Sequence, residues 1–309
     1  MIWSGVMPAM TTPFDTNLAV DHTFLAHHAA WLLGNGCTGL VALGSLGEGA
    51  TLEASEKVDV LKTVVRAAGK APVVAGIAAL STQAAIRLGK EAEQAGCSAL
   101  MVLPPYVYSS DWREMKAHVA AVMASTSLSC MLYNNPVAYK TDFLPSQIAE
   151  LAEEHANFHA VKESSADVRR VTGIREVLGD RLKILTGVDD GLVEGVAAGA
   201  EGWIAGLVNA YPAESVKLFN LAKAGKHQEA FELYRWFLPL LRMDTVPKFV
   251  QLIKWVQEQA GVGSARVRPP RLEIAGEELA AAREVFKTAL DSRPAITEIP
   301  ISNFKGVAA

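Results

Sequence analysis

Short apolar runs alternate with amphipathic stretches along most of the chain. The runs are nearly continuous in apolar residues, as is typical of parallel strands buried on both faces. They are Val6–Thr12, Gly39–Ser45, Pro72–Ala78, Ala99–Pro104, Ser129–Asn134, Phe158–Lys162, Leu182–Gly187 and Gly202–Val208. Apolar positions spaced three and four apart predict helices over 21–34, 53–69, 82–95, 111–125, 145–155, 167–178, 190–198 and 212–224.

This strand and helix alternation predicts a (β/α)8 TIM barrel. An open doubly wound sheet is the alternative, but the Gly-x-Gly-x-x-Gly turn typical of its first strand is missing from the sequence. The pattern changes after residue 225, where 226–242, 246–261 and 276–290 predict three amphipathic helices without strands. We therefore expect a barrel over 1–225, a C-terminal helical extension packed on it over 226–292, and a tail over 293–309.

Composition and charge narrow the class of protein. The 309 residues carry a net charge of -4 without a basic stripe, so we expect no nucleic-acid partner. No stretch approaches the roughly 18 apolar residues of a membrane span, and no leader peptide is apparent. Cys37, Cys97 and Cys130 are too few and too widely spaced for a disulfide framework. These features favour a cytoplasmic location.

Lys162 is the residue with the strongest chemical signal. Barrel enzymes place their chemistry at the carboxyl ends of the strands, and Lys162 stands at the end of the sixth predicted strand. Burial lowers the pKa of a lysine, and a neutral amine attacks carbonyl carbon to give an imine. The same position is also compatible with a structural lysine that is neutralised by Glu163.

Two further strand ends carry polar groups. Tyr133 closes the fifth strand, where its hydroxyl can move protons to and from an imine, or where its ring simply caps the barrel core. The turn from Gly44 to Glu48 offers backbone N–H groups and the Ser45 hydroxyl, which can grip a carboxylate or relay a proton. A plain strand-to-helix turn has the same composition.

A metal-dependent aldolase is a rival on the same barrel, and it requires His, Asp or Glu ligands that converge at strand ends. The histidines fall mostly in predicted helices, and the adjacent His27 and His28 cannot chelate one ion from one helix face. We therefore expect no metal site. The loops after the last two strands also lack a Gly-rich phosphate cradle.

As a set, four motifs resemble the dihydrodipicolinate synthase/N-acetylneuraminate lyase superfamily in order and spacing, from about residue 4 to residue 290. They are Gly44-Ser45-Leu46-Gly47-Glu48, Tyr133-Asn134-x-Pro136, Val161-Lys162-Glu163 and Gly187-Val188-Asp189-Asp190. The resemblance implies a homotetramer or homodimer that uses no metal and no organic cofactor. It also implies roles for single residues: Lys162 as the Schiff-base lysine, Tyr133 as the general acid/base, Ser45 and the N–H groups of Ser45 and Leu46 as carboxylate ligands, and Gly187, Ile204 and Tyr106 as parts of the pocket.

Three departures from the family pattern bear on the substrate. Leu46 replaces a second hydroxyl of the turn. Val107 stands where the synthases carry a tyrosine lent to the neighbouring subunit, so Tyr106 or Tyr108 would have to substitute. Ala138 replaces the arginine that binds the aldehyde substrate's carboxylate. Synthesis of 4-hydroxy-tetrahydrodipicolinate is therefore less expected.

A Gly-Ser-Leu-Gly-Glu turn together with Tyr-Asn-Asn-Pro looks like the branch of 1-pyrroline-4-hydroxy-2-carboxylate deaminases, which act in hydroxyproline breakdown. We expect this reaction on a small 2-oxo acid or cyclic imine. A 2-keto-3-deoxy sugar acid aldolase or dehydratase remains open, because the same lysine enamine serves both. A non-catalytic oxo-acid sensor also remains open, because one relay hydroxyl is lost.

Overall fold

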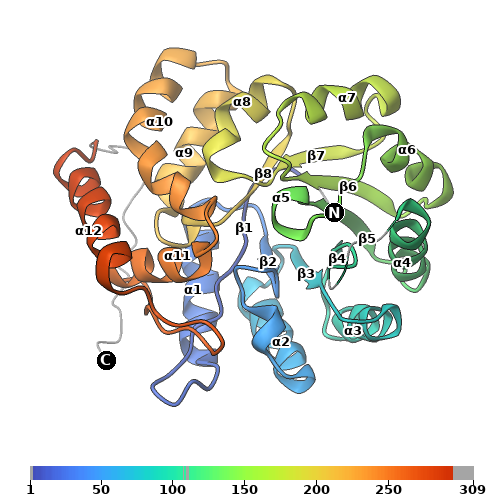
Figure 1. The fold of residues 1–309 in the computed structure, drawn as a ribbon, viewed down its shortest axis with the longest axis horizontal. Coiled ribbons are helices and arrows are strands. Elements are labelled where there is room, and N and C mark those ends of the chain that lie inside the picture. The colour runs from blue at the N-terminus through green and yellow to red at the C-terminus, as the bar shows by residue number, and fades with distance from the viewer. Residues whose placement is uncertain (1–2, 107, 109–110, 295–309) are drawn as a thin grey trace.

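Parallel strands close into a barrel in the computed structural model, which describes residues 3–106, 108 and 111–294. The strand order is β1-β8-β7-β6-β5-β4-β3-β2. A parallel bridge between Ala9, just after β1, and Val41 of β2 joins the two ends of this order and closes the sheet. Figure 1 shows the helices around this sheet. The predicted (β/α)8 barrel is confirmed.

The barrel strands are short and buried, as their apolar composition requires. They are β1 Gly5–Pro8, β2 Leu40–Ala42, β3 Val73–Ile77, β4 Ala99–Val102, β5 Ser129–Asn134, β6 Phe158–Glu163, β7 Lys183–Thr186 and β8 Gly202–Ala205. The barrel helices are α1 His22–Gly34, α2 Ala54–Ala68, α3 Thr82–Gln94, α4 Trp112–Ala124, α6 Pro145–Glu154, α7 Arg169–Leu178, α8 Leu192–Ala197 and α9 Pro212–Lys223.

The sequence pattern places these elements well but misses the short ones. Helix α5 (Pro136–Tyr139) lies between two predicted elements, in a segment for which we predicted no helix. Single 3-10 turns follow three of the strands: η1 Gly49–Thr51, η2 Asp189–Gly191 and η3 Leu207–Asn209. A fourth, η4 Arg242–Asp244, follows the helix over His227–Leu241. Elements of three or four residues are too short to show a helical period, so periodicity cannot detect them.

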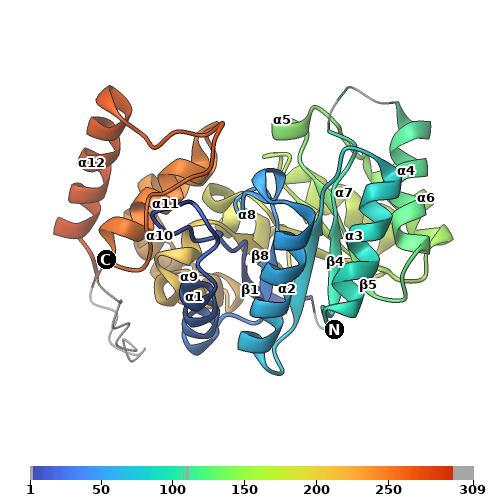
Figure 2. The same ribbon diagram turned by 90° about the horizontal axis from the view of Figure 1, so that it is seen from below.

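The last three helices, α10 His227–Leu241, α11 Phe249–Gln259 and α12 Gly276–Asp291, lie on one side of the barrel, opposite α4 and α6 (Figures 1 and 2). Lys254 of α11 forms a buried ion pair of 2.8 Å with Glu48. Its ammonium also donates to the Thr12 carbonyl at 2.9 Å. Glu48 therefore fastens the extension to the turn after β2. Most of the predicted tail lies outside the described residues.

Within the described part of the chain, every helix is too short or too polar to cross a bilayer.

Candidate active site

Strands β5 and β6 bring Tyr133 and Lys162 side by side. The two residues are register partners, and Lys162 also pairs in register with Leu185 of β7, which in turn pairs with Gly202 of β8. Register partners on parallel strands point to the same face of a sheet. Glu163 points to the opposite face, where its carboxylate accepts from Asn134 Nδ2 at 3.0 Å. The lumen therefore receives the lysine, and the acid that we considered as its neutralising partner faces the helices.

The Lys162 side chain is 6% exposed, and its Nζ lies over the Tyr133 ring, 4.0 Å from the ring centroid. Among the described residues it makes no hydrogen bond and no ion pair within 4.0 Å. Burial disfavours the charged ammonium and lowers the pKa of Lys162 to about 8, although the carboxylates of Asp244 and Asp189 oppose this shift. A pKa of about 8 leaves a fraction of neutral, nucleophilic amine near pH 7.

Two aspartates complete the charge distribution at the mouth. Asp189 is buried after β7 and accepts from Trp203 Nε1 at 3.0 Å and from the Leu207 N–H at 2.8 Å. Burial raises the pKa of Asp189 to about 6 against these hydrogen bonds. Burial, followed by the like charge of Asp189, also raises the pKa of Asp244 well above its usual range, and the Lys162 charge opposes this.

Asp244 belongs to the extension, yet its carboxyl lies directly over Gly206 at the end of β8. A Cβ atom on Gly206 would fall 1.9 Å from Asp244 Oδ1. The glycine is thus the residue that lets this carboxyl approach the strand end. The sequence analysis did not identify Asp244, because this residue does not follow a predicted strand. It lies in η4, which brings it to the barrel mouth.

Tyr133 is buried, and burial raises the pKa of its phenol to about 12. Its hydroxyl accepts from Asn135 Nδ2 at 3.0 Å. The hydroxyl of Ser164 also faces the phenol and lowers this pKa slightly, yet the buried Ser164 Oγ makes no hydrogen bond of ordinary geometry with any described residue. Ser164 is thus a second group that sequence reasoning passed over.

Ser45 is hydrogen-bonded to Tyr139, not to Tyr106 or Tyr108. Tyr108 is 56% exposed in the chain, and Tyr106 contacts the Tyr139 ring at a centroid distance of 6.0 Å. The expectation that Tyr106 or Tyr108 replaces the missing relay tyrosine stays a prediction, and within the chain the hydrogen-bond partner of Ser45 is Tyr139. Tyr139 was overlooked because α5, which turns its side chain back toward the turn after β2, was not predicted.

The remaining predicted site residues lie as follows. Gly187 lies against the lysine, since a Cβ there would come 2.7 Å from Lys162 Cε and 1.9 Å from Ser164 Oγ. Ile204 is buried in β8 and shares the lumen face with Gly202. Leu46 is buried, and Ser45 is half-buried. Leu43, just before this turn, has a left-handed φ of 63°, an uncommon conformation for a branched side chain.

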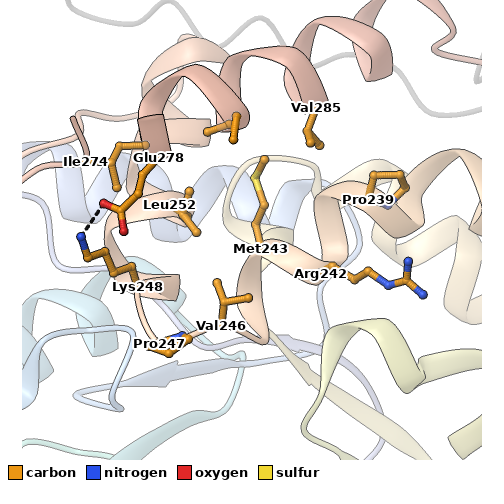
Figure 3. A pocket seen from close by; sticks show the side chains of 12 residues that line it. Pro239, Arg242, Met243, Val246, Pro247, Lys248, Leu252, Ile274, Glu278 and Val285 are labelled. Carbon is orange, nitrogen blue, oxygen red and sulfur yellow. Dashed lines mark hydrogen bonds and ion pairs between the residues drawn. The ribbon is translucent and has the colours of Figure 1, made fainter. Parts of the chain in front are cut away.

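Two cavities lie away from the barrel mouth. One of about 400 Å³ lies between the η4 segment, α11 and α12, with Lys248 and Glu278 paired at its edge (Figure 3). Another of about 290 Å³ lies outside the strands beside Glu163 and Thr186. In the part of the chain that the structure describes, no three His, Cys, Asp or Glu side chains converge as metal ligands.

A barrel with a buried lysine of lowered pKa and a buried phenol at its mouth has the architecture of Schiff-base lyases and aldolases. Residues 2–289 match the model of the dihydrodipicolinate synthetase family. The chain belongs to this family and is an enzyme of its lysine Schiff-base lyase and aldolase class.

Several relatives resemble the chain over most of its length. The 4-hydroxy-tetrahydrodipicolinate synthase of Methanocaldococcus jannaschii is 30% identical over 288 residues, which cover 93% of this chain and 98% of the relative. The synthase of Shewanella piezotolerans is 31% identical and covers 89% and 94%. The solved dihydrodipicolinate synthase of Acinetobacter baumannii, complexed with pyruvate, superposes with a TM-score of 0.88 at 27% identity, covering 93% and 99%.

Proposed function

We propose that Lys162 forms a Schiff base with a small 2-oxo acid or cyclic imino acid, and that the reaction is the deamination of 1-pyrroline-4-hydroxy-2-carboxylate. The observation that carries the first part is the position of Lys162: it is buried beside Tyr133, with its pKa lowered to about 8 and no ion-pair partner within 4.0 Å among the described residues. A lysine placed for stability would normally have such a partner.

In this reaction the neutral amine adds to C2 of the ring, and the C2–N bond breaks to leave the ring nitrogen as a primary amine on C5. Loss of a C3 proton gives an enamine. The C4 hydroxyl is then protonated, and the enamine expels it as water. Migration of the double bond places an imine at C5. Two waters then hydrolyse the C5 imine and the lysine imine, releasing ammonia and an oxo-acid semialdehyde. The net change is one water consumed and one ammonia released.

The site offers groups for these proton transfers. Tyr133 lies beside the lysine and is placed to take the C3 proton. The pKa of Asp244 is raised by burial, so a larger fraction of this carboxyl is protonated than in an exposed aspartate, and that fraction can protonate the leaving hydroxyl. The carboxylate of the substrate would bind Ser45 and the N–H groups of Ser45 and Leu46, with Gly187, Ile204 and Tyr106 around the carbon chain.

The second candidate is 4-hydroxy-tetrahydrodipicolinate synthase. All the relatives named above carry that activity in their names, and one cation at the site favours it. Ala138 cannot bind a second carboxylate, but Arg271 of the extension lies close enough to Tyr139 for its charge to oppose the rise that burial causes in the pKa of that phenol. A 2-keto-3-deoxy sugar acid aldolase or dehydratase would use the same lysine and stays a third possibility.

One experiment tests the imine and the reaction in sequence. Borohydride is added with pyruvate, and peptide mass analysis should find the reduced pyruvate skeleton on Lys162. Lys162→Ala should lose the adduct, while Lys183→Ala should keep it, since Lys183 lies at the other end of a barrel strand and pairs with Glu201 at 2.9 Å. An adduct on another lysine, or none, would contradict the mechanism.

The reaction is then assigned by a panel of substrates: 1-pyrroline-4-hydroxy-2-carboxylate, 2-keto-3-deoxy sugar acids, N-acetylneuraminate, and pyruvate with aspartate semialdehyde. Release of ammonia from 1-pyrroline-4-hydroxy-2-carboxylate, without turnover of the other substrates, supports the deaminase. Condensation of pyruvate with the aldehyde, lost in Arg271→Ala, supports the synthase. Imine trapping without turnover of any of these substrates would instead favour an oxo-acid sensor.

Assembly and location complete the proposal. We expect a homotetramer or homodimer in the cytoplasm, where the buried free thiols of Cys37, Cys97 and Cys130 would stay reduced. Sedimentation velocity tests the assembly, and a monodisperse monomer would contradict it. Cell fractionation tests the location.

A further inference from the structure

Four side chains form a continuous row from the lysine to the turn after β2. Lys162 Nζ lies over the Tyr133 ring at 4.0 Å. The Tyr133 ring meets the Tyr139 ring edge to face, with centroids 5.7 Å apart and planes at 87°. The Tyr139 hydroxyl is hydrogen-bonded to Ser45 Oγ. All four residues come from one chain, although 117 positions separate Ser45 from Lys162 in the sequence (162 minus 45).

Asn135 holds the two phenols of this row in a fixed relation. Its Oδ1 accepts from the Ala138 N–H at 3.0 Å and thereby caps helix α5, which carries Tyr139. Its Nδ2 donates to the Tyr133 hydroxyl at 3.0 Å. One amide side chain thus orients the helix bearing the second phenol and the hydroxyl of the first.

The segment after α5 is fixed as firmly. The buried Asn134 Oδ1 accepts from the Phe143 N–H at 3.0 Å. The Asp142 carboxylate forms two hydrogen bonds with Arg170 of α7, at 3.0 and 2.6 Å. Tyr139 is therefore held from both ends of its short segment, as a group that takes part in chemistry must be.

We infer that Tyr139 is a proton-relay residue of the reaction, acting through Tyr133, and that this relay is completed within a single chain. The inference rests on the proposed Schiff-base function. Ser45 and the two phenols each carry one O–H donor and at least one acceptor lone pair. The Tyr133 and Tyr139 hydroxyls make no direct hydrogen bond with each other among the described residues, so the proposed transfer between them passes through a bridging water. A tyrosine from a neighbouring subunit is then not required.

The proton balance shows where the relay acts. The neutral amine adds to the carbonyl carbon, and one proton moves from nitrogen to oxygen to give a carbinolamine. The C–O bond then breaks, and the hydroxyl leaves as water with a proton from Tyr133, leaving the protonated imine. Tyr139 returns a proton to Tyr133 through the bridging water and regains one from Ser45, which exchanges with solvent. The C3 proton lost on forming the enamine travels the same path outward.

Exchange of the pyruvate methyl protons in D2O reports this path without any second substrate, because each imine–enamine cycle replaces a C3 proton with deuterium. Tyr139→Phe keeps the ring and removes only the hydroxyl. We expect its exchange rate to fall about 10²-fold, the lower end of the range for a placed acid or base. Its borohydride adduct on Lys162 at saturating pyruvate and its melting temperature should stay close to wild type. Tyr211→Phe is the matched control, because the Tyr211 ring packs on Trp236 and Phe237 of α10, and it should exchange at the wild-type rate.

The outcomes distinguish a proton relay through Tyr139 from a structural role of Tyr139 and from failure of the proposed function. Exchange within twofold of wild type in Tyr139→Phe overturns the relay. Loss of the adduct together with a lowered melting temperature in Tyr139→Phe also overturns it, because that pattern indicates a structural role. A wild-type enzyme that gives neither adduct nor exchange overturns the proposed function itself.

A hybrid protein tests whether the Tyr139 and the Lys162 of one site belong to the same chain. Lys162→Ala and Tyr139→Phe chains are co-expressed with different tags, and the hybrid is purified. If each chain supplies its own Tyr139, the hybrid should exchange no faster than Tyr139→Phe alone. Recovery of exchange in the hybrid would show that the hydroxyl is lent between subunits and would overturn that part of the inference. A protein that forms no hybrid because it is a monomer supports the origin within one chain directly.

Discussion

Lys162 Nζ lies 4.0 Å from the centroid of the Tyr133 ring, and the two residues are register partners on β5 and β6. A cation over a desolvated aromatic face is stabilised by up to about 2 kcal/mol, which opposes deprotonation of the amine. Burial acts in the other direction and prevails, since the pKa of Lys162 falls to about 8. The pair therefore keeps a reactive amine in a fixed orientation beside a hydroxyl.

Replacing Tyr133 by phenylalanine should separate binding from proton transfer. The ring that faces Lys162 is kept, whereas the hydroxyl is lost. We expect kcat to fall about 10²–10⁴-fold, the usual contribution of a placed acid or base. Steady-state kinetics on the substrate found in the panel measures this. A variant with nearly full kcat would exclude Tyr133 as the main acid/base, and Tyr106→Phe should then be examined.

The rate of imine trapping should depend on pH with a midpoint near the Lys162 pKa of about 8. The ammonium is not nucleophilic, so at subsaturating pyruvate the rate should fall tenfold for each pH unit below the midpoint and level off above it. Stopped reactions with borohydride over pH 6–10 measure the profile. A midpoint near the ordinary lysine pKa would contradict the burial of the amine.

Asp244→Asn should move this midpoint to lower pH. The Asp244 carboxylate is the largest charge that raises the Lys162 pKa, so its removal leaves burial less opposed. Asp180→Asn is the matched control, because Asp180 is exposed and pairs with Arg175. An unchanged midpoint in Asp244→Asn would mean that the extension does not influence the amine in solution.

Gly187→Ala should disable the site without unfolding the barrel. The added Cβ would come 2.7 Å from Lys162 Cε and 1.9 Å from Ser164 Oγ, so the lysine must leave its position. We expect the adduct on Lys162 to form at least about tenfold more slowly, since small displacements of reacting groups cost up to about 10²-fold. Gly34→Ala is the control: it has open space and should stabilise α1 slightly. Wild-type trapping in Gly187→Ala would place the lysine elsewhere.

Lys254→Met should lower the free energy of unfolding, because it removes the shorter of the two ion pairs of the fully buried Glu48 carboxylate and leaves only Arg271, 3.9 Å away. Removing one partner of a buried pair typically costs about 3–5 kcal/mol. The double variant Glu48→Gln/Lys254→Met should recover part of this loss. Urea denaturation of the three proteins gives the values. A loss below about 1 kcal/mol would show that the Arg268 N–H, which donates to Glu48 at 3.1 Å, and the Arg271 guanidinium satisfy the carboxylate without Lys254.

The barrel and the position of Lys162 are determined by the sequence itself. Continuous apolar runs predict strands buried on both faces, and a lysine at the end of such a run is unusual enough to stand out. β5 shows how closely this pattern specifies an element: Ser129–Asn134 was predicted and observed with the same bounds. The same kind of pattern identifies Tyr133 and Lys162, because each lies one residue before the end of its strand.

Only the tertiary structure brings Tyr139 and Asp244 to the mouth. Tyr139 sits at the end of a four-residue helix whose direction depends on the Asn135 cap, and so short an element leaves no periodic signal. Asp244 belongs to a different part of the chain and reaches Gly206 because the extension packs on the barrel, anchored through Lys254 and Glu48. Local patterns determine which residues form strands, whereas contacts between distant segments determine which side chains meet.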